Sequence, residues 1–155
     1  MRSVLCRNIE GIDVTIIEEN GAIVRLSANA NYADRSATPN ETPLLLEAAR
    51  QVEEYLQGAR TEFGLPLNLQ GTPFQLDVWN VLLAIPYGQT RSYRQIAEAV
   101  GRPRAARAIG QANHHNPVWI VVPCHRVIQS DGSLGGYGGG VELKRRLLAL
   151  EAEKK

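Results

Sequence analysis

Hydrophobic and polar positions alternate through the first thirty residues, and this alternation predicts three short β-strands. The strands are expected at residues 2–8, 12–18 and 22–28. Asn20-Gly21 separates the last two, and an Asn-Gly pair between β-prone runs is the strongest short-range hairpin signal. We therefore predict a β-hairpin, followed by a polar loop over residues 29–41.

A helical pattern follows this loop. Thr42 precedes Pro43 in the favoured arrangement for a helix start, an apolar stripe runs from Leu44 to Leu56, and Gly58 ends the helix. Residues 61–71 read as a linker with at most one short strand. Residues 1–70 are therefore predicted to form a small α/β supporting domain, a strand hairpin plus a helix.

The second half of the chain is predicted to be mainly helical. Helices are expected at residues 73–85, 93–100 and 104–113, and Ser92 with Gln95 forms a capping box at the start of the second. Two short helices joined by a glycine-containing turn are typical of a helix-turn-helix. Residues 71–155 are therefore predicted to form a C-terminal domain, which makes the whole an α/β two-part chain.

An apolar run at residues 118–122 follows this helix pair and predicts a short buried strand that leads into a turn at Cys124. A glycine-rich loop occupies residues 131–140, and an amphipathic helix is expected from residue 141 to the end. The candidate active site thus combines a short strand with a turn.

Charge changes the picture of possible partners. The formal net charge of +1 argues against nucleic-acid binding, for which a basic excess is usual. The charge is unevenly distributed, however: residues 1–70 hold 6 basic and 10 acidic residues, and residues 71–155 hold 11 and 6. Between Gly88 and Arg126 six arginines stand against Glu98 alone. This asymmetry indicates a polyanionic partner for the second half.

The sequence argues more strongly against secreted, membrane-spanning and metal-binding proteins. The first residues lack the apolar run of a secretory signal, and no stretch approaches the roughly 20 apolar residues of a membrane helix. Cys6 and Cys124 form no CxxC pair, which indicates a reduced cytoplasmic or nuclear setting. We expect no membrane partner. We also expect no metal site, because structural zinc needs about four Cys or His ligands.

Cys124 is the candidate nucleophile. His125 and Arg126 follow it directly, and cationic neighbours favour the reactive thiolate while a histidine can act as base through a bridging water. The alternative reading is a buried structural cysteine, and the two stand about even on spacing alone. Cys6 has no histidine nearby and is predicted to pack within its strand.

The fourth predicted helix is the candidate DNA-reading element. Small residues surround Arg107, so the backbone could approach a groove closely with one long cation projecting from it. The alternative is a solvated helical hairpin with ordinary surface arginines. A reactive cysteine within about twenty residues of such a helix suggests chemistry on a DNA base, which has to be flipped out of the duplex first.

These residues point to a known family. The strings GTPFQLDVWNVLLAIPYGQTRSY, RAARAIGQANHHNPV, IVVPCHRVI, GGYGGG and LKRRLLALE follow one another between Gly71 and Glu151. This segment resembles the O6-alkylguanine-DNA alkyltransferases, also called methylated-DNA–protein-cysteine methyltransferases. The resemblance implies single-turnover, irreversible transfer of an alkyl group from O6-alkylguanine in duplex DNA to the protein, without a cofactor. Residues 1–70 match only by size and general α/β character.

The resemblance also implies residue roles. Cys124 would accept the alkyl group, His125 would be the base oriented by Glu151, Tyr93 would assist the guanine leaving group, and Asn116 would brace the active-site turn. The expected DNA-binding residues are Arg107, Ala106, Arg104, Ser92, Arg94 and Gly110, with Arg107 replacing the flipped base. The expected alkylguanine pocket consists of Tyr93, Trp119, Val122, Tyr137 and Gly138. Trp119, where many members carry a small residue or Pro, either belongs to the core or narrows that pocket.

Three other classes stay open at this point. A non-catalytic lesion binder of the same family usually replaces the cysteine with Trp, so Cys124 disfavours it unless Trp119 blocks the pocket. A helix-turn-helix regulator would normally dimerise. No heptad seam is present in the sequence, so a monomer is expected. A cysteine hydrolase is disfavoured because nothing indicates an acyl substrate.

Overall fold

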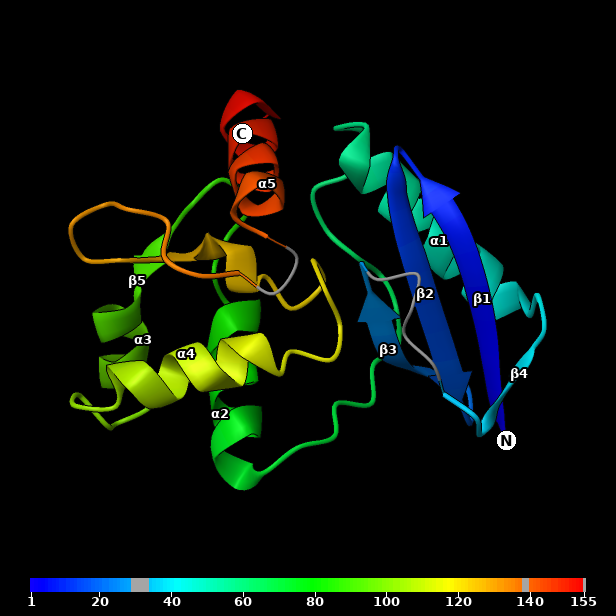
Figure 1. Cartoon of the computed structure of the whole chain (residues 1–155), viewed down its shortest axis with the longest axis horizontal. Helices are drawn as coiled ribbons and strands as arrows, with labels where there is room; N and C mark the ends of the chain where they lie inside the picture. The colour runs from blue at the N-terminus through cyan, green and yellow to red at the C-terminus, as the bar shows by residue number, and fades with distance from the viewer. Residues whose placement is uncertain (29–33, 138–139, 155) are drawn as a thin grey trace. The chain divides into compact units, whose positions relative to one another are not determined.

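The computed structural model describes residues 1–28, 34–137 and 140–154 of the chain. The chain divides into two compact units (Figure 1). The first contains residues 1–70 together with 117–119, and the second contains residues 71–116 and 120–155. The α/β two-part fold class is confirmed.

The first unit is built on a four-stranded sheet of order β3-β2-β1-β4. Its strands are β1 (Arg2–Ile9), β2 (Ile12–Glu19), β3 (Ala22–Ser27) and β4 (Ala37–Pro39). The pairs β1–β2 and β2–β3 are antiparallel, which confirms the predicted hairpin. Asn20 and Gly21 have φ values of 53° and 78°, the left-handed geometry that a two-residue hairpin turn requires.

Helix α1 (Pro43–Leu56) packs against β1 and β2, and its N-cap Thr42 accepts a hydrogen bond from the Leu45 backbone N–H at 3.1 Å. The start and the end of this helix agree with the prediction. Strand β4 was not predicted, because it lies inside the polar loop expected at residues 29–41. It pairs parallel with β1, and three residues are too few for a periodic signal.

The prediction of a strand at residues 118–122 is wrong. Val118 forms only an isolated bridge with Leu26, the following residues form turns, and Ile120 has a φ of 60°. Val118, Trp119, Ile120 and Val122 are nonetheless buried. The apolar run at residues 118–122 therefore reflects buried side chains and not an extended backbone. In so short a segment, the sequence pattern of a buried turn and that of a buried strand are the same.

The second unit is mainly helical. It contains α2 (Pro73–Leu83), α3 (Tyr93–Ala99), α4 (Ala106–His114) and α5 (Val141–Lys154), and strands β5 (Arg91–Ser92) and β6 (Val127–Ile128) pair parallel. The capping box of Ser92 and Gln95 is present at the start of α3. Helix α4 begins two residues later than predicted, and its N-cap Ala105 supplies no side-chain hydrogen bond.

The core of this unit fixes the helix-turn-helix. Val78, Trp79 and Leu82 of α2 are fully buried or nearly so. Trp79 also donates its indole N–H to the carbonyl of Ala112 at 2.9 Å, which ties α2 to α4. Gly101 has a φ of 77° in the turn between α3 and α4, a conformation that favours glycine. Helices α3 and α4 pack against each other, and both contact α2 (Figure 1).

Candidate active site

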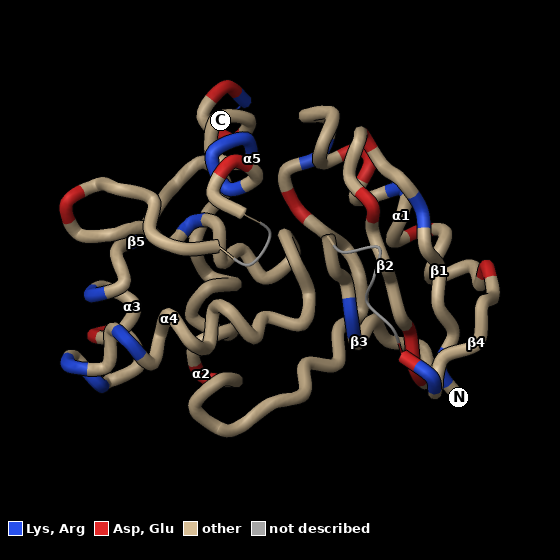
Figure 2. The backbone as a smooth tube through the Cα atoms, in the orientation of Figure 1, with Lys and Arg blue, Asp and Glu red and all other residues tan. Residues whose placement is uncertain are grey.

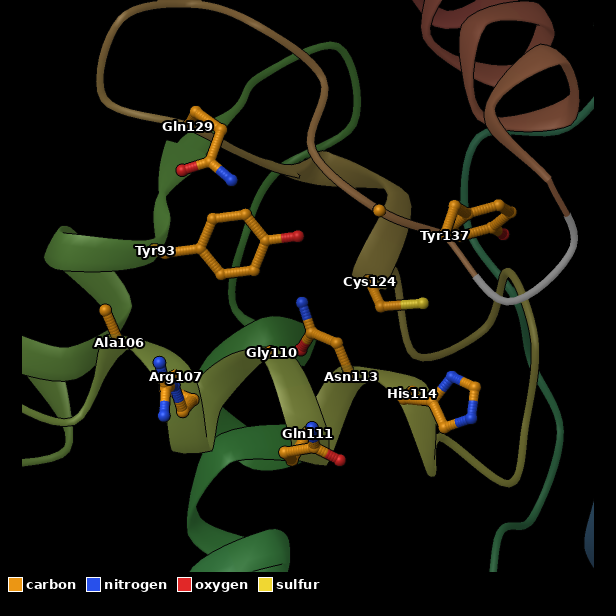
Figure 3. Close-up of a pocket in the computed structure, with 11 residues that line it drawn as sticks. Tyr93, Ala106, Arg107, Gly110, Gln111, Asn113, His114, Cys124, Gln129 and Tyr137 are labelled. Atoms are coloured by element: carbon orange, nitrogen blue, oxygen red, sulfur yellow. The ribbon is translucent and has the colours of Figure 1, made fainter.

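A cavity of about 720 Å³ lies within the second unit. Helices α3 and α4, the Cys124 turn and the glycine-rich loop all contribute to its wall (Figure 3). The lining residues are Tyr93, Ala106, Arg107, Gly110, Gln111, Asn113, His114, Cys124, Gln129, Gly136 and Tyr137. The candidate nucleophile and the candidate DNA-reading helix thus face the same cavity.

Cys124 is held by a short turn of helix. Residues Cys124–Arg126 form a 3₁₀-helix between Pro123 and β6, and Cys124 is 7% exposed. The amide nitrogen of Asn116 donates to the carbonyl of Val122 at 2.7 Å and lies 3.3 Å from the Cys124 sulfur. Asn116 therefore braces the backbone of the turn and supplies a donor to the sulfur, a contact that favours the thiolate.

Glu151 of α5 is the centre of a buried network behind this turn. Its Oε2 lies 2.7 Å from His125 Nε2, and its Oε1 accepts from Arg126 Nε at 2.8 Å. Arg126 also donates to Oε2 at 3.0 Å and to the carbonyl of Ile85 at 2.7 Å, and the Gly88 N–H donates to Oε1 at 3.2 Å. All three charged or titratable side chains are at least 92% buried. The network fixes the orientation of the His125 ring.

Burial sets the protonation states at the site. It raises the pKa of the Cys124 thiol, against which the Asn116 hydrogen bond and the Lys144 charge act. Burial lowers the pKa of His125, while Glu151 acts in the opposite direction. His125 is therefore neutral at pH 7. Because Nε2 lies against the Glu151 carboxylate, the neutral ring carries its proton on Nε2 and its lone pair on Nδ1.

Lys144 of α5 is a completely buried ammonium group that the sequence did not single out. Its Nζ donates to the carbonyls of Val127 at 2.7 Å, Gly136 at 3.3 Å and Leu134. It also lies 5.8 Å from the centre of the Tyr93 ring. Lys144 therefore anchors the glycine-rich loop against β6 and places a positive charge near Cys124, whose pKa it lowers.

Replacing Lys144 with methionine is expected to slow the reaction of Cys124 with iodoacetamide at pH 8 by about threefold to tenfold. The lost ammonium raises the thiol pKa, and one pKa unit corresponds to a tenfold change in thiolate at a pH below the pKa. The rate is measured on the Cys124 peptide by mass spectrometry. Lys154→Met, at the exposed end of the same helix, is the control. Equal rates in both variants would contradict the role of Lys144.

The structure brings most of the predicted site together. Tyr93, Ala106, Arg107, Gly110, Cys124 and Tyr137 line the cavity, and His125, Glu151 and Asn116 support the Cys124 turn. Trp119 and Val122 are buried but are not among the lining residues. Gly138 lies outside the described residues.

One of the six arginines counted between Gly88 and Arg126 does not lie on the surface. Arg126, counted there among the arginines near the DNA helix, is instead buried in the ion pair with Glu151. Arg94, Arg104 and Arg107 are exposed, and Arg94 pairs with Glu98 at 3.2 Å. Ser92 uses its hydroxyl to cap α3. Figure 2 shows the basic positions around α3 and the turn into α4.

Several cavity residues were missed by sequence reasoning. Gln111 and His114 follow Arg107 at the i+4 and i+7 positions of α4, and Asn113 follows Ala106 at i+7. Helical periodicity from Arg107 could have identified the first two. Gln129 and Gly136 carry no such signal, because the loop that holds them is irregular.

Comparisons with known proteins agree with this geometry. Residues 73–153 match the family model described as 6-O-methylguanine DNA methyltransferase, DNA binding domain, and residues 13–69 match the ribonuclease-like domain of the same enzyme. The chain belongs to the O6-methylguanine DNA methyltransferase family. The predicted family is therefore confirmed, and the match extends into the N-terminal half, where the sequence resemblance rested only on size and general character.

Individual members of the family are similar over nearly the whole chain. The methylated-DNA–protein-cysteine methyltransferase of Mycobacterium leprae is 46% identical, with 96% of this chain and 92% of that protein covered. The constitutive methylated-DNA–protein-cysteine methyltransferase of Bacillus subtilis is 47% identical, with 90% of this chain and 88% of that protein covered. The crystal structure of Mycobacterium tuberculosis O6-methylguanine methyltransferase has a TM-score of 0.88 at 41% identity, with 100% and 95% covered. A structure of Mycobacterium tuberculosis OGT in complex with DNA has the same TM-score at 43% identity, with 99% and 93% covered.

Three other features concern the rest of the molecule. The prediction that Cys6 packs within its strand is wrong, because Cys6 is exposed on β1. Side chains alternate between the two faces of a strand, and the side chain of Cys6 falls on the solvent face. Within the described residues, no three His, Cys, Asp or Glu side chains are grouped so that they could hold a metal ion. Among the same residues, no helix has the length and hydropathy to cross a membrane.

Proposed function

We propose that this methyltransferase-family chain repairs DNA by moving the alkyl group of O6-alkylguanine directly onto Cys124. The observation that carries the proposal is the position of the Cys124 thiol in a cavity whose opposite wall is the DNA-reading helix α4 (Figure 3). Family members of 46% and 47% identity, named methylated-DNA–protein-cysteine methyltransferases, support it.

The transfer is a single displacement. The Cys124 thiolate attacks the alkyl carbon, an S–C bond forms, and the C–O6 bond breaks with its electron pair leaving on the guanine. His125 receives the thiol proton through a bridging water, and Glu151 stabilises the imidazolium that results. The thioether is not hydrolysed, so one protein molecule repairs one lesion. Because the damaged DNA is itself the alkyl donor, the reaction balances without a cofactor.

Tyr93 is the proposed proton donor to the leaving guanine. Its ring lines the cavity, and burial raises the pKa of its hydroxyl, so the group is protonated at neutral pH. A guanine anion is a poor leaving group unless its charge is neutralised, and a positioned acid contributes roughly two to four orders of magnitude to such a step. Tyr93 thus acts on the base while His125 acts on the thiol.

The cavity takes a single base rather than a duplex, so the alkylated guanine has to be flipped out. Ala106 and Gly110 leave α4 with little bulk beside the cavity, which allows the backbone to approach a groove closely. Arg107 lines the same cavity and is exposed, and we propose that it fills the vacated stack. Arg94 and Arg104 would contact phosphates, and Ser92 would lie at the edge of this surface.

Arg107→Ala is expected to slow alkyl transfer from duplex DNA by about 100-fold, because unstacking a base costs a few kcal/mol that the arginine no longer offsets. Transfer from the free base O6-benzylguanine should change by less than about threefold, since no base is flipped. Single-turnover kinetics on both substrates measure the difference. Arg104→Ala, the control, should weaken binding to the duplex but leave the transfer rate at saturating protein unchanged. An equal loss on both substrates in Arg107→Ala would contradict base replacement.

The function is tested with duplex DNA that carries a radiolabelled O6-methyl group. Stoichiometric label on the peptide that contains Cys124 supports direct transfer. Binding without transfer would instead favour a non-catalytic lesion binder, and several turnovers per protein would exclude the single-use mechanism. We further propose that the protein acts as a monomer in the cytoplasm, or in the nucleus if its source has one.

We propose that Trp119 and Val122 act on the alkylguanine pocket only indirectly. Neither lines the cavity, but Val122 accepts the hydrogen bond from Asn116 that braces the Cys124 turn. Trp119 is 6% exposed in the preceding turns. The bulk of Val122 would restrict how far the Cys124 turn can move when larger alkyl groups enter.

A further inference from the structure

The carboxylate of Glu151 is shared between His125 and Arg126. Arg126 binds both of its oxygens, with Nε donating to Oε1 at 2.8 Å and Nη2 donating to Oε2 at 3.0 Å. His125 Nε2 lies 2.7 Å from the same Oε2. Two donors of one guanidinium on the two oxygens of one carboxylate make a strong and well-oriented ion pair. The carboxylate that orients the proposed base is therefore also the counter-ion of a guanidinium.

Water screens the charges of this cluster very little. The side chains of His125, Glu151 and Arg126 are 0%, 1% and 8% exposed. While the imidazole is neutral, one negative and one positive charge cancel. Because His125 Nε2 and Arg126 Nη2 contact the same oxygen, they lie within about 6 Å of each other, a range over which one charge changes the pKa of its neighbour. A proton on His125 would place two cations on one carboxylate, so Arg126 opposes it.

The groups that act on His125 have opposite effects. Burial lowers the pKa of the imidazole and Glu151 raises it, while the charges of Arg126 and Lys144 lower it. The Lys144 ammonium is completely buried and lies on α5 together with Glu151. Two positive charges therefore offset the effect of the carboxylate on the imidazole.

Two further titratable groups belong to the same surroundings. Cys124 precedes His125 in the 3₁₀-helix, and the Tyr87 ring centre lies 5.6 Å from the Arg126 guanidinium carbon. Burial raises the pKa of both the Cys124 thiol and the Tyr87 hydroxyl. Both groups are therefore protonated at neutral pH, and neither adds a negative charge that would favour an imidazolium.

We propose that Arg126 is a positioning residue whose charge balances Glu151, so that His125 stays a neutral base, able to accept the Cys124 proton, at a lower pH than Glu151 alone would allow. Without the guanidinium charge, a proton on the imidazole would become the counter-ion of the carboxylate. His125 would then be an imidazolium and could accept no further proton. The consequence for alkyl transfer rests on the proposed function, whereas the protonation state is a property of the protein without DNA.

The direct test is the titration of His125 in the free protein, followed by NMR of nitrogen-labelled imidazole rings. Arg126→Met is expected to raise the titration midpoint of His125 by about one to three pH units. Arg126→Lys keeps a positive charge and should restore most of the difference. His114 and His115 are exposed and serve as internal references, because their midpoints should not change. A His125 ring with the same midpoint in both proteins, or neutral throughout in both, would overturn the role of Arg126.

Arg145→Met is the matched control, because Arg145 pairs with Glu142 on α5 in an exposed position. It removes an arginine–glutamate pair that water screens, so the His125 midpoint should stay at its wild-type value.

A second pair of variants keeps the test decisive if Arg126→Met does not fold. Glu151→Gln leaves the guanidinium beside His125 without the carboxylate, and Glu151→Gln with Arg126→Met removes both charges, an exchange that buried ion pairs often tolerate. His125 should titrate at a higher pH in the double variant than in Glu151→Gln. Equal midpoints in these two proteins would contradict the proposal.

The pH profile of single-turnover transfer from O6-methylguanine DNA separates charge balance from a purely structural role. The acid limb of Arg126→Met should move to higher pH by the same amount as the His125 midpoint. An equal loss of rate at every pH would show that Arg126 only supports the fold. A raised midpoint together with no transfer by the wild-type protein would overturn the proposed function and leave the charge balance in place. An unchanged midpoint with transfer intact would overturn the role of Arg126 alone.

Discussion

Cys124→Ala will leave no detectable transfer of a labelled methyl group from O6-methylguanine DNA to the protein, while binding to the same DNA persists. The alanine carries no atom that can accept the alkyl group, and water in the cavity is a far weaker nucleophile than a thiolate. DNA binding should survive because the exposed arginines of α3 and α4 are unchanged. Gel shift and single-turnover labelling of the same preparations measure the two properties.

The chain offers its own control for this experiment. Cys6 is the other cysteine, it is exposed on β1, and its thiol lies 3.7 Å from the Thr15 hydroxyl. Cys6→Ala should therefore transfer the label at the wild-type rate and stoichiometry. Label on any residue of Cys124→Ala, or loss of transfer in Cys6→Ala, would contradict Cys124 as the acceptor.

Glu151→Ala will lower the free energy of unfolding by about 3–5 kcal/mol, the usual effect of removing one partner from a buried ion pair. Among the described residues, the buried Arg126 guanidinium would keep its hydrogen bond to the Ile85 carbonyl and its position over the Tyr87 ring but no anionic partner, and the Gly88 N–H would lose its acceptor. The midpoint of urea unfolding, followed by circular dichroism, measures the change. Such a loss is a large fraction of the stability of a domain of this size.

Glu151→Gln separates stability from catalysis. The amide keeps the shape and one acceptor oxygen, so unfolding should be affected less than in the alanine variant. It no longer carries the charge that stabilises a protonated His125, so transfer should slow by more than the stability change explains. Glu142→Ala is the control, since Glu142 lies on the same helix and pairs with Arg145 in an exposed position. Wild-type stability in Glu151→Ala would contradict the network.

Local patterns were sufficient for much of the fold. The Asn20-Gly21 turn, the Thr42 cap and the Ser92–Gln95 capping box are each decided by a few adjacent residues, and all were predictable. The run at residues 118–122 was predicted as a strand because burial and extension give the same apolar signal. There the tertiary structure decided, through the bridge between Val118 and Leu26 and the left-handed Ile120.

The sequence by itself determined which candidate groups the site can use: a cysteine followed by a histidine, a glutamate on the last helix, and a basic helix pair. These are local or motif-based properties that survive without coordinates. Only the tertiary structure decided which groups meet. Arg126, counted in the sequence among the basic residues of the second half, forms a buried pair with Glu151, and Lys144 anchors the cavity loop. Their roles depend on contacts between residues distant in sequence, and no local pattern encodes such distances.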